Sequence, residues 1–325
     1  MTTNLSPGFL AAEVEFKKAN TDEERLAALE EMLSTIPKHK GTEKMCADIK
    51  RRISKLKESI EEARSSTKKG ISHHIPKDGV AQCVLVGAPN SGKSSLLNTL
   101  TAANASVGDF PFTTTRPQPG MMPFQNISFQ IIDLPAVSEE FMEPWVMNLV
   151  RVADCILLLA PLDDLDSLDP VIGLLKASRI EFAHSFTEAD YHSPTVTIPV
   201  IVIGTKSDID ESGDLFAFLR ELYPAYSAVP ISILQPDAAE TIGSILYKTL
   251  DFIRVYSKAP GKTHNPDQPI VLHHGATVID AALEIHKDFA ENLKYARVWG
   301  DRTFEGQRVQ RDYTLSEGDI IEFKI

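Results

Sequence analysis

Residues Val84–Leu100 read "VLVGAPNSGKSSLLNTL" and pass from an apolar run through a glycine-rich turn into a leucine-containing segment. The apolar run belongs to residues 81–86, which are short, apolar and rich in branched side chains, as in a buried parallel strand. From Ser94 onward the leucines recur at helical spacing. The stretch therefore predicts a strand, a tight turn and a helix in immediate succession.

The turn fits the phosphate-loop pattern G-x-x-x-x-G-K-[ST], with Gly87, Gly92, Lys93 and Ser94 at the fixed positions. In this pattern backbone N–H groups surround phosphate oxygens, and the start of the helix adds partial positive charge. The lysine reaches the outer phosphates, and the serine hydroxyl can ligate Mg²⁺. We therefore expect a nucleotide phosphate site formed by Asn90, Ser91, Gly92, Lys93, Ser94 and Ser95.

Composition limits the remaining possibilities. The chain has 325 residues, 43% of them hydrophobic, and a formal net charge of -12, so that any contact with nucleic acid must be local. Its three cysteines lie far apart and indicate reduced thiols. Neither a secretory signal nor an apolar run of membrane-spanning length is apparent. We expect a soluble cytoplasmic protein with neither a membrane nor DNA as partner.

Three blocks follow one another along the chain. Residues 1–76 predict a helical hairpin and a linker, with lysines and arginines concentrated between Lys38 and Lys57. This basic stretch is either a solvated helix face or a small surface for RNA phosphates. Residues 77–260 alternate apolar strands with helical segments, which predicts an α/β domain with a parallel sheet and helices on both faces. Residues 268–325 predict a smaller domain of strands around a helix.

The tetrapeptide "TKSD" follows a later strand of the α/β block and contains Thr205, Lys206 and Asp208. An aspartate carboxylate there can accept both the N1–H and the 2-amino protons of guanine, whereas adenine lacks this pair of donors. The lysine stem can lie along the base. The pattern favours a guanine nucleotide, GTP or GDP, over an ATPase interpretation.

Two further segments fit a GTP-binding protein. The threonine run Thr113–Thr115 lies in a proline-bounded loop, and one of its hydroxyls is placed to reach Mg²⁺ when the γ-phosphate is present. Asp133 ends an apolar strand and is expected to bind Mg²⁺ through water. The order of phosphate loop, threonine loop, aspartate and T-K-x-D is that of a GTP-binding protein.

These segments, together with the C-terminal "VLHHGATVIDAALEIHKDF", resemble the Obg superfamily of GTPases. The likeness is greatest to developmentally regulated GTP-binding proteins, whose last domain is a TGS domain with a β-grasp fold. The resemblance implies that Thr114 is the switch I threonine and acts with Lys93 in catalysis. It also implies that Ser232 and Ile233 occupy the loop that contacts the guanine base. A ribosome or structured RNA is the implied partner, and a protein regulator is a further candidate.

The sequence departs from this family at the second switch. The family's Asp-x-x-Gly is Asp133-Leu134-Pro135-Ala136 here, and alanine keeps the N–H but restricts φ. The next residue is Val137, which has no polar group to orient the attacking water. We expect slow hydrolysis of GTP, or alternatively an RNA- or protein-binding adaptor with little catalysis. The chain between Asp154 and Thr205 is also too short for the domain that developmentally regulated proteins insert.

Asn90 allows two interpretations. Its side-chain carbonyl can hold K⁺ against the phosphates and so supply the positive charge that an arginine finger would otherwise bring. Asparagine is equally a common turn residue that tolerates unusual φ values. The sequence leaves both open.

Overall fold

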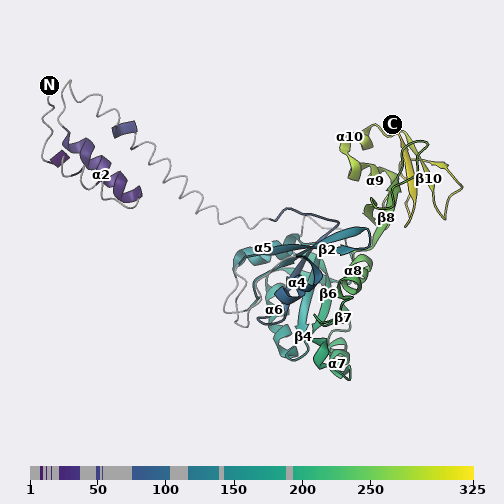
Figure 1. The fold of residues 1–325 in the computed structure, drawn as a ribbon, viewed down its shortest axis with the longest axis horizontal. Coiled ribbons are helices and arrows are strands. Elements are labelled where there is room, and N and C mark those ends of the chain that lie inside the picture. Colours follow the sequence, from purple (N-terminus) through teal and green to yellow (C-terminus); the bar gives the residue numbers. More distant parts are fainter. Residues whose placement is uncertain are drawn as a thin grey trace. The chain divides into compact units, whose positions relative to one another are not determined.

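We describe the fold from a computed structural model. It describes residues 8–9, 12, 16, 22–36, 49–51, 53, 75–102, 116–138, 143–187 and 193–325, and the chain divides into two units, residues 1–72 and 73–325. In the first unit, helix α2 spans Asp22–Thr35 and confirms the first predicted helix (Figure 1). Its buried Leu29 and Met32 pack with Ile36, Ile49 and Ile53. Most of the predicted second helix and its basic stretch lies outside the described residues.

The second unit contains a seven-stranded sheet in the order β2-β3-β1-β4-β6-β5, with β7 also paired to β6. The strands are β1 Gln82–Val86, β2 Gln118–Phe124, β3 Ile127–Asp133, β4 Cys155–Pro161, β5 Ile180–Ala183, β6 Val196–Thr205 and β7 Ser227–Ile231. All pairs are parallel except β2 with β3. The α/β fold is therefore as predicted, with a mixed rather than purely parallel sheet.

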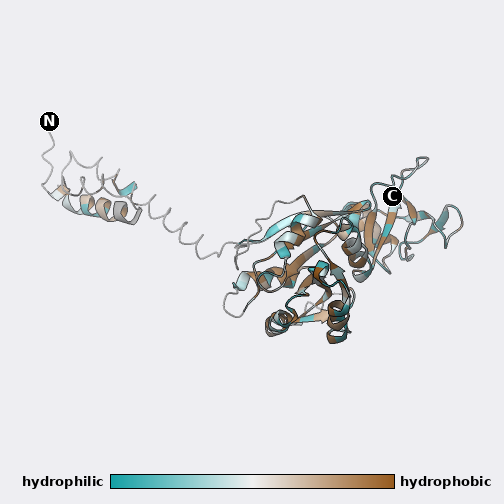
Figure 2. Cartoon of the chain, turned by 60° about the horizontal axis from the view of Figure 1, so that its bottom comes forward, coloured by the Kyte–Doolittle hydropathy of each residue, from teal (hydrophilic) through white to brown (hydrophobic). Residues whose placement is uncertain are grey.

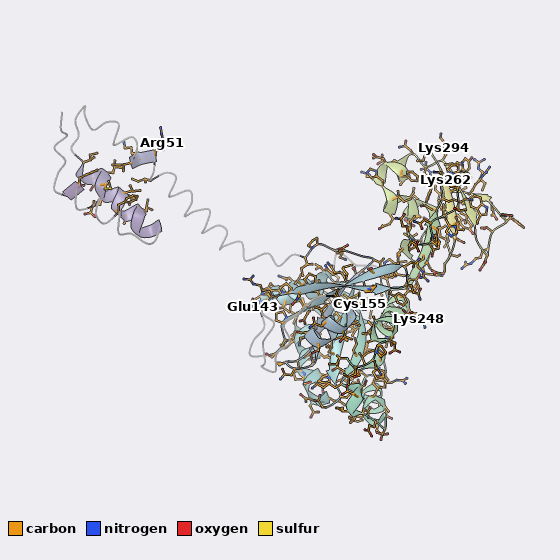
Figure 3. All side chains as sticks on the ribbon, viewed as in Figure 1. Arg51, Glu143, Cys155, Lys248, Lys262 and Lys294 are labelled. Atoms are coloured by element: carbon orange, nitrogen blue, oxygen red, sulfur yellow. The ribbon has the colours of Figure 1, made fainter. Side chains whose placement is uncertain are left out.

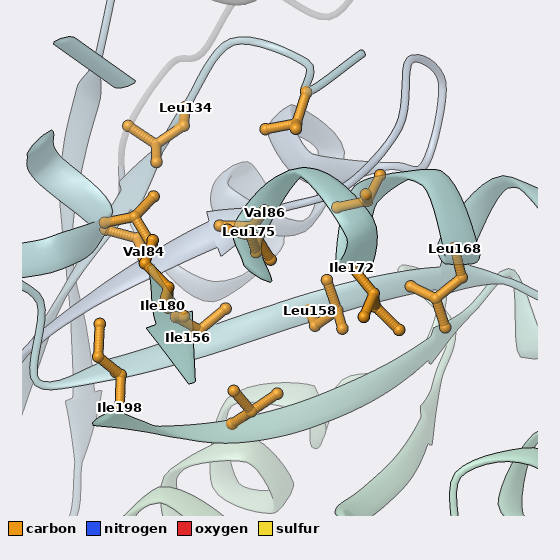
Figure 4. Packing of buried hydrophobic residues seen from close by; sticks show 14 of the residues in the cluster. Val84, Val86, Leu134, Ile156, Leu158, Leu168, Ile172, Leu175, Ile180 and Ile198 are labelled. Carbon is orange, nitrogen blue, oxygen red and sulfur yellow. The ribbon is translucent and has the colours of Figure 1, made fainter. Parts of the chain in front are cut away.

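Helices cover both faces of this sheet. They are α4 Lys93–Leu100, α5 Pro144–Val152, α6 Leu168–Ala177, α7 Asp214–Leu222 and α8 Ala238–Thr249, with short 3-10 turns η1 Leu165–Ser167 and η2 Ser207–Ile209. Buried residues of α5, α6 and α7 pack on one face, where Val84, Ile156 and Leu158 lie in the core (Figure 4). Buried residues of α4 and α8 pack on the other face. The sheet is thus the middle layer of three.

The strands of the large sheet are strongly hydrophobic (Figure 2). β1 and β4 are buried along their whole length, because parallel strands between two helical layers have no solvent face. Cys83 and Cys155 are opposite each other on these strands, and both are buried free thiols, as expected for two of the cysteines. Figure 3 labels Cys155. Among the described residues no helix combines the length and the apolar character needed to cross a membrane.

Two strands of the large sheet were not expected from the sequence. β2 has the sequence "QPGMMPF", and its two prolines and one glycine argue against a central strand. It lies at the edge of the sheet, where proline is tolerated because one row of N–H groups needs no partner. β5 has only four residues and carries too short a pattern to be recognised.

A second, five-stranded sheet has the order β11-β10-β12-β8-β9. Its strands are β8 Phe252–Ser257, β9 Ile270–His273, β10 Tyr295–Trp299, β11 Gln307–Val309 and β12 Ile320–Lys324, and helices α9 Val278–Ile285 and α10 Lys287–Glu291 join β9 to β10. Because β8 pairs with β9 and β12, this sheet starts at Phe252 rather than at the expected residue 268. The apolar pattern of β8 does not reveal which of the two sheets it joins.

Candidate nucleotide-binding site

The phosphate loop connects β1 to α4, and its conformation depends on two glycines. Gly92 has φ 90°, in the left-handed region that side chains other than glycine rarely adopt. At Gly87 an added Cβ would lie 2.6 Å from Ser91 Oγ and 3.2 Å from Leu159 Cβ. The loop therefore takes this shape only with glycine at both positions.

The side chain of Lys93 folds back into the loop. Its Nζ donates to the carbonyl oxygens of Ala88 (2.8 Å) and Gly87 (3.1 Å) and to Ser91 Oγ (3.3 Å). The side chain is only 6% exposed, and this burial lowers its pKa from 10.5 to about 8, although the charge of Asp133 acts in the opposite direction. A buried ammonium bonded to uncharged oxygens fits the binding of an anion, because a phosphate would compensate for its lost hydration.

Ser94 in the first turn of α4 and Asp133 at the end of β3 lie together because β1, which leads into α4, is adjacent to β3. β1 and β3 run parallel, with Leu85 opposite Asp133, so that the aspartate lies beside the start of α4. Ser94 Oγ donates to Asp133 Oδ2 at 2.6 Å, and Asp133 is fully buried. A hydroxyl and a carboxylate supply the hard oxygen donors that Mg²⁺ prefers, so these two residues fit a magnesium site. The third predicted ligand, Thr114, lies outside the described residues.

Residues at the C-terminal end of β6 contact the phosphate loop and the segment that follows β4. Thr205 Oγ1 donates to the carbonyl of Ser91 at 2.9 Å and so ties the two loops together. Lys206 has φ 59°, and its Nζ contacts both carboxylate oxygens of Asp163 at 2.7 and 2.9 Å. Asp163 was not predicted from the sequence, although it lies just beyond the C-terminal end of β4, where ligand-binding residues of such sheets gather.

Asp208 is oriented by the loop after β7. The hydroxyl of the buried Ser232 donates to Asp208 Oδ1 at 2.7 Å, and Gln235 Oε1 accepts from the N–H of Ser232 at 3.2 Å. Ile233 is 51% exposed. The predicted base-contacting residues Asp208, Ser232 and Ile233 therefore lie near one another, and the structure adds Gln235 as a support that the sequence did not indicate.

The segments that carry the candidate site residues thus lie at the C-terminal ends of β1, β3, β4, β6 and β7, at one edge of the sheet. Residues 82–195 match the family model described as 50S ribosome-binding GTPase, and residues 253–325 match that of the TGS domain. The chain contains a GTPase domain of this ribosome-binding family and a TGS domain. The resemblance stated from the motifs is confirmed, and the TGS match begins within β8, in agreement with the strand pairing.

Several curated proteins are similar to this chain over most of its length. An uncharacterised GTP-binding protein of Methanocaldococcus jannaschii is 28% identical over 93% of this chain and 93% of its own length. Developmentally regulated GTP-binding protein 2 of Homo sapiens is 23% identical over 92% of this chain and 98% of its own length. Among solved structures, Era in complex with MgGDPNP and part of 16S ribosomal RNA has a TM-score of 0.41 and 22% identity, over 68% of this chain and 72% of that one.

The segment predicted as the second switch begins against the phosphate loop. The backbone N–H of Val137 donates to the carbonyl of Gly87 at 3.1 Å, and its side chain is buried in the hydrophobic core beside Val86 and Leu134. Ala136 is also buried. Residue 137 therefore presents neither a polar side chain nor a free N–H to the nucleotide site.

Asn90 lies at the exposed tip of the phosphate loop, with φ 59°. Asparagine is among the few side chains that adopt this conformation readily, which agrees with its interpretation as a turn residue. Its side chain has no hydrogen bond to the residues that the structure describes, and its contact with K⁺ remains a prediction. Ser95 follows in the first turn of α4 and is half-buried.

Proposed function

We propose that this protein binds GTP with Mg²⁺ and hydrolyses it slowly to GDP and phosphate. The observation that carries the proposal is the buried ammonium of Lys93, which is hydrogen-bonded to uncharged oxygens within a loop that leads directly to the Ser94–Asp133 pair. A triphosphate supplies the missing negative charge. The proposal assigns guanine selectivity to the Asp208 carboxylate, which Ser232 orients.

The roles of the individual residues follow from their positions. Lys93 would bind the outer phosphates, and backbone N–H groups of residues 90–95 would bind the remaining oxygens. Ser94 and Asp133 would hold Mg²⁺, which neutralises charge on the phosphates when bound. Thr114 is the proposed switch I residue. Lys206 would lie along the base while Asp163 fixes its ammonium group.

Slow hydrolysis is proposed because Val137 cannot orient water. Either K⁺ held by Asn90 or a residue from a partner would then complete the site. A catalytically weak adaptor is the second candidate, and the bond from Val137 to Gly87 favours it, because this bond holds the start of switch II on the loop.

We further propose that the partner is a ribosome or structured RNA, in agreement with the description of the matching GTPase family. In this scheme the nucleotide state controls association, and a protein regulator is an additional candidate partner.

Phosphate release by the purified full chain separates the two candidates. Incubation with GTP and Mg²⁺ should give multiple turnovers, and Lys93→Ala should abolish them. Turnover that is absent in the wild type, alone and with ribosomes, would support the adaptor. Ribosome co-sedimentation with GDP or a non-hydrolysable GTP analogue then tests whether nucleotide state controls association.

A further inference from the structure

Helix α7 lies at the outer rim of the GTPase domain and has apolar side chains on two of its faces (Figure 1). On the inner face, Leu219 is buried in the core of the large sheet, and Phe216 and Tyr223 pack against the same core. Phe216 also lies close to Gly204 of β6, where an added Cβ would be 3.0 Å from the phenylalanine ring. These three residues are sufficient to attach the helix to the domain.

The second apolar face of α7 is exposed. Leu215, Phe218 and Leu222 are 39%, 51% and 49% exposed, and their helical spacing places them on one side of the helix. A surface helix needs only one apolar stripe, which faces the core. An additional group of exposed apolar side chains on a soluble protein indicates a surface for a partner. We call Leu215, Phe218 and Leu222 the outer stripe of α7.

Acidic side chains border the outer stripe. Glu211 lies just before the helix, and Asp214 and Glu221 are neighbours of Phe218 on the helix surface, on the side away from the core. All three are exposed, and none has an ion pair within 4.0 Å among the residues that the structure describes. Arg220, the basic residue of α7, lies on the opposite side from the stripe.

The neighbouring helix extends this negative charge. Tyr223 Oη donates to Asp169 Oδ1 at 2.6 Å and so joins α7 to α6, and the exposed Asp164 and Asp166 precede that helix. Such a border would repel the phosphates of a nucleic acid or an anionic lipid, and also a second copy of the same stripe. It would attract a partner that combines apolar and basic side chains.

The outer stripe is connected to the predicted base-binding segment. Asp208 lies in η2, and Asp210 follows directly after this turn. The two carboxylate oxygens of Asp210 accept from the backbone N–H groups of Leu215 at 3.2 Å and Phe216 at 2.9 Å, at the start of α7. A protein bound to the outer stripe would therefore contact the helix that is tied to the segment of Asp208.

We propose that the outer stripe of α7 binds a basic amphipathic helix of a partner protein. The apolar face of that helix would cover Leu215, Phe218 and Leu222, and its lysines or arginines would pair with the acidic border, as in other surfaces that recognise amphipathic helices. The inference rests on the protein regulator in the proposed function and names the surface that contacts it.

Fluorescence anisotropy on the full chain tests the proposal with a labelled peptide of about eighteen residues, which has leucine on one helical face and lysine on the other. Phe218→Gln with Leu222→Gln should weaken binding about tenfold or more, because it removes most of the apolar contact area. Glutamine is a good helix former, so α7 should remain folded.

The matched control for the stripe is Leu283→Gln with Ile285→Gln. It replaces two similarly exposed apolar side chains on α9 and should leave peptide affinity within about twofold. Equal losses in the α7 and α9 variants would overturn the proposal, because the peptide would then bind any exposed apolar side chain.

The acidic border is tested separately. Glu211→Gln with Glu221→Gln should weaken peptide binding about threefold or more at low salt and reduce its salt dependence. Glu284→Gln with Glu305→Gln removes the same charge from exposed positions of the TGS domain and should change affinity less than about 1.5-fold. Equal losses in both would show that binding depends only on net charge and would refute the proposal. A peptide with glutamate in place of lysine that binds as tightly would refute it as well.

A second copy of the chain is the alternative occupant. Sedimentation equilibrium measures self-association, which the Gln substitutions at Phe218 and Leu222 should leave unchanged. A wild-type dimer that these substitutions dissociate would overturn the proposal and assign the stripe to a contact between copies.

The outcome is independent of nucleotide chemistry. Thermal unfolding of each variant should match the wild type, because the substituted side chains are exposed. A chain that binds the basic peptide through the outer stripe but binds no guanine nucleotide would contradict the proposed function and leave this inference standing. A chain that hydrolyses GTP but fails to bind the peptide at low salt would do the reverse.

Discussion

The backbone N–H of Val137 donates to the carbonyl of Gly87 at 3.1 Å, while the valine side chain points into the hydrophobic core. The first residues of the predicted switch II are therefore fixed by a bond to the phosphate loop and by the packing of the valine side chain in the core. In this arrangement the position that carries glutamine in Ras-like enzymes has a structural role. Substitution of Val137 tests whether this residue also affects GTP hydrolysis.

Val137→Thr should lower the free energy of unfolding by about 1–3 kcal/mol, because it buries a hydroxyl in an apolar cluster. It should leave the rate of GTP hydrolysis unchanged, because the side chain faces the core. Chemical denaturation and a phosphate-release assay measure the two quantities. The same substitution at the exposed Val152 serves as control and should cost less than about 0.5 kcal/mol. A clear rise in hydrolysis with Val137→Thr would show that residue 137 reaches the nucleotide.

Nucleotide binding should be accompanied by proton uptake by Lys93. Burial holds its pKa at about 8 in the free protein, and phosphate oxygens would raise it again. Affinity should therefore fall as the pH rises through 8. Titration calorimetry of the wild type in buffers of different ionisation enthalpy should detect the proton, and Lys93→Arg, which stays charged, should take up less. Equal proton uptake in both proteins would contradict the assignment.

The same group affects stability without nucleotide. An unfolded lysine keeps its proton to about pH 10.4, whereas folded Lys93 loses it near pH 8, so that the unfolded chain binds more protons between these values. The contribution of Lys93 to the free energy of unfolding should therefore rise with pH across this window. Lys93→Met should flatten that rise in denaturant titrations. An unchanged pH dependence in the variant would show that Lys93 titrates normally.

Asp208→Asn should reduce GTP affinity about 10–100-fold and allow a xanthosine nucleotide to bind, because the amide can meet the carbonyl at the 2-position of xanthine. Competition binding with GTP, ATP and the xanthosine nucleotide measures this. Asp163→Asn is the matched control, because Asp163 contacts Lys206 and would not touch the base edge. It should alter affinity modestly without changing base preference. A wild type that binds ATP as tightly as GTP would refute the guanine assignment.

The K⁺ prediction needs a glycine variant at Asn90. With φ 59°, alanine would be strained there, whereas glycine keeps the loop conformation and removes the side-chain carbonyl. Hydrolysis should be faster in potassium than in sodium at equal ionic strength, and Asn90→Gly should abolish the difference while keeping most GTP affinity. Each tenfold change in rate corresponds to about 1.4 kcal/mol of barrier. Equal rates in both salts would refute K⁺ assistance and favour a partner-supplied residue.

Local sequence determined the phosphate loop. The glycines, the lysine and the serine lie within eight consecutive residues, and each acts through backbone geometry or a side chain within reach of its neighbours. The alternation of apolar strands and helices determined the α/β fold for a related reason. Burial between two helical layers requires uninterrupted apolar strands, and this requirement is visible in β1, β4 and β6.

Tertiary structure alone decided contacts between residues distant in the chain. The bonds of Thr205 to Ser91 and of Ser232 to Asp208 depend on strand order. The proline-containing β2 is a strand because it lies at the edge, and β8 joins the small sheet through pairing that its own residues do not encode. The register that places Arg297 opposite Arg308 is likewise a property of the assembled sheet. A short-range motif is visible in the sequence because the chain itself makes its residues neighbours. The long-range pairs named above form only when the tertiary fold brings their strands and loops together.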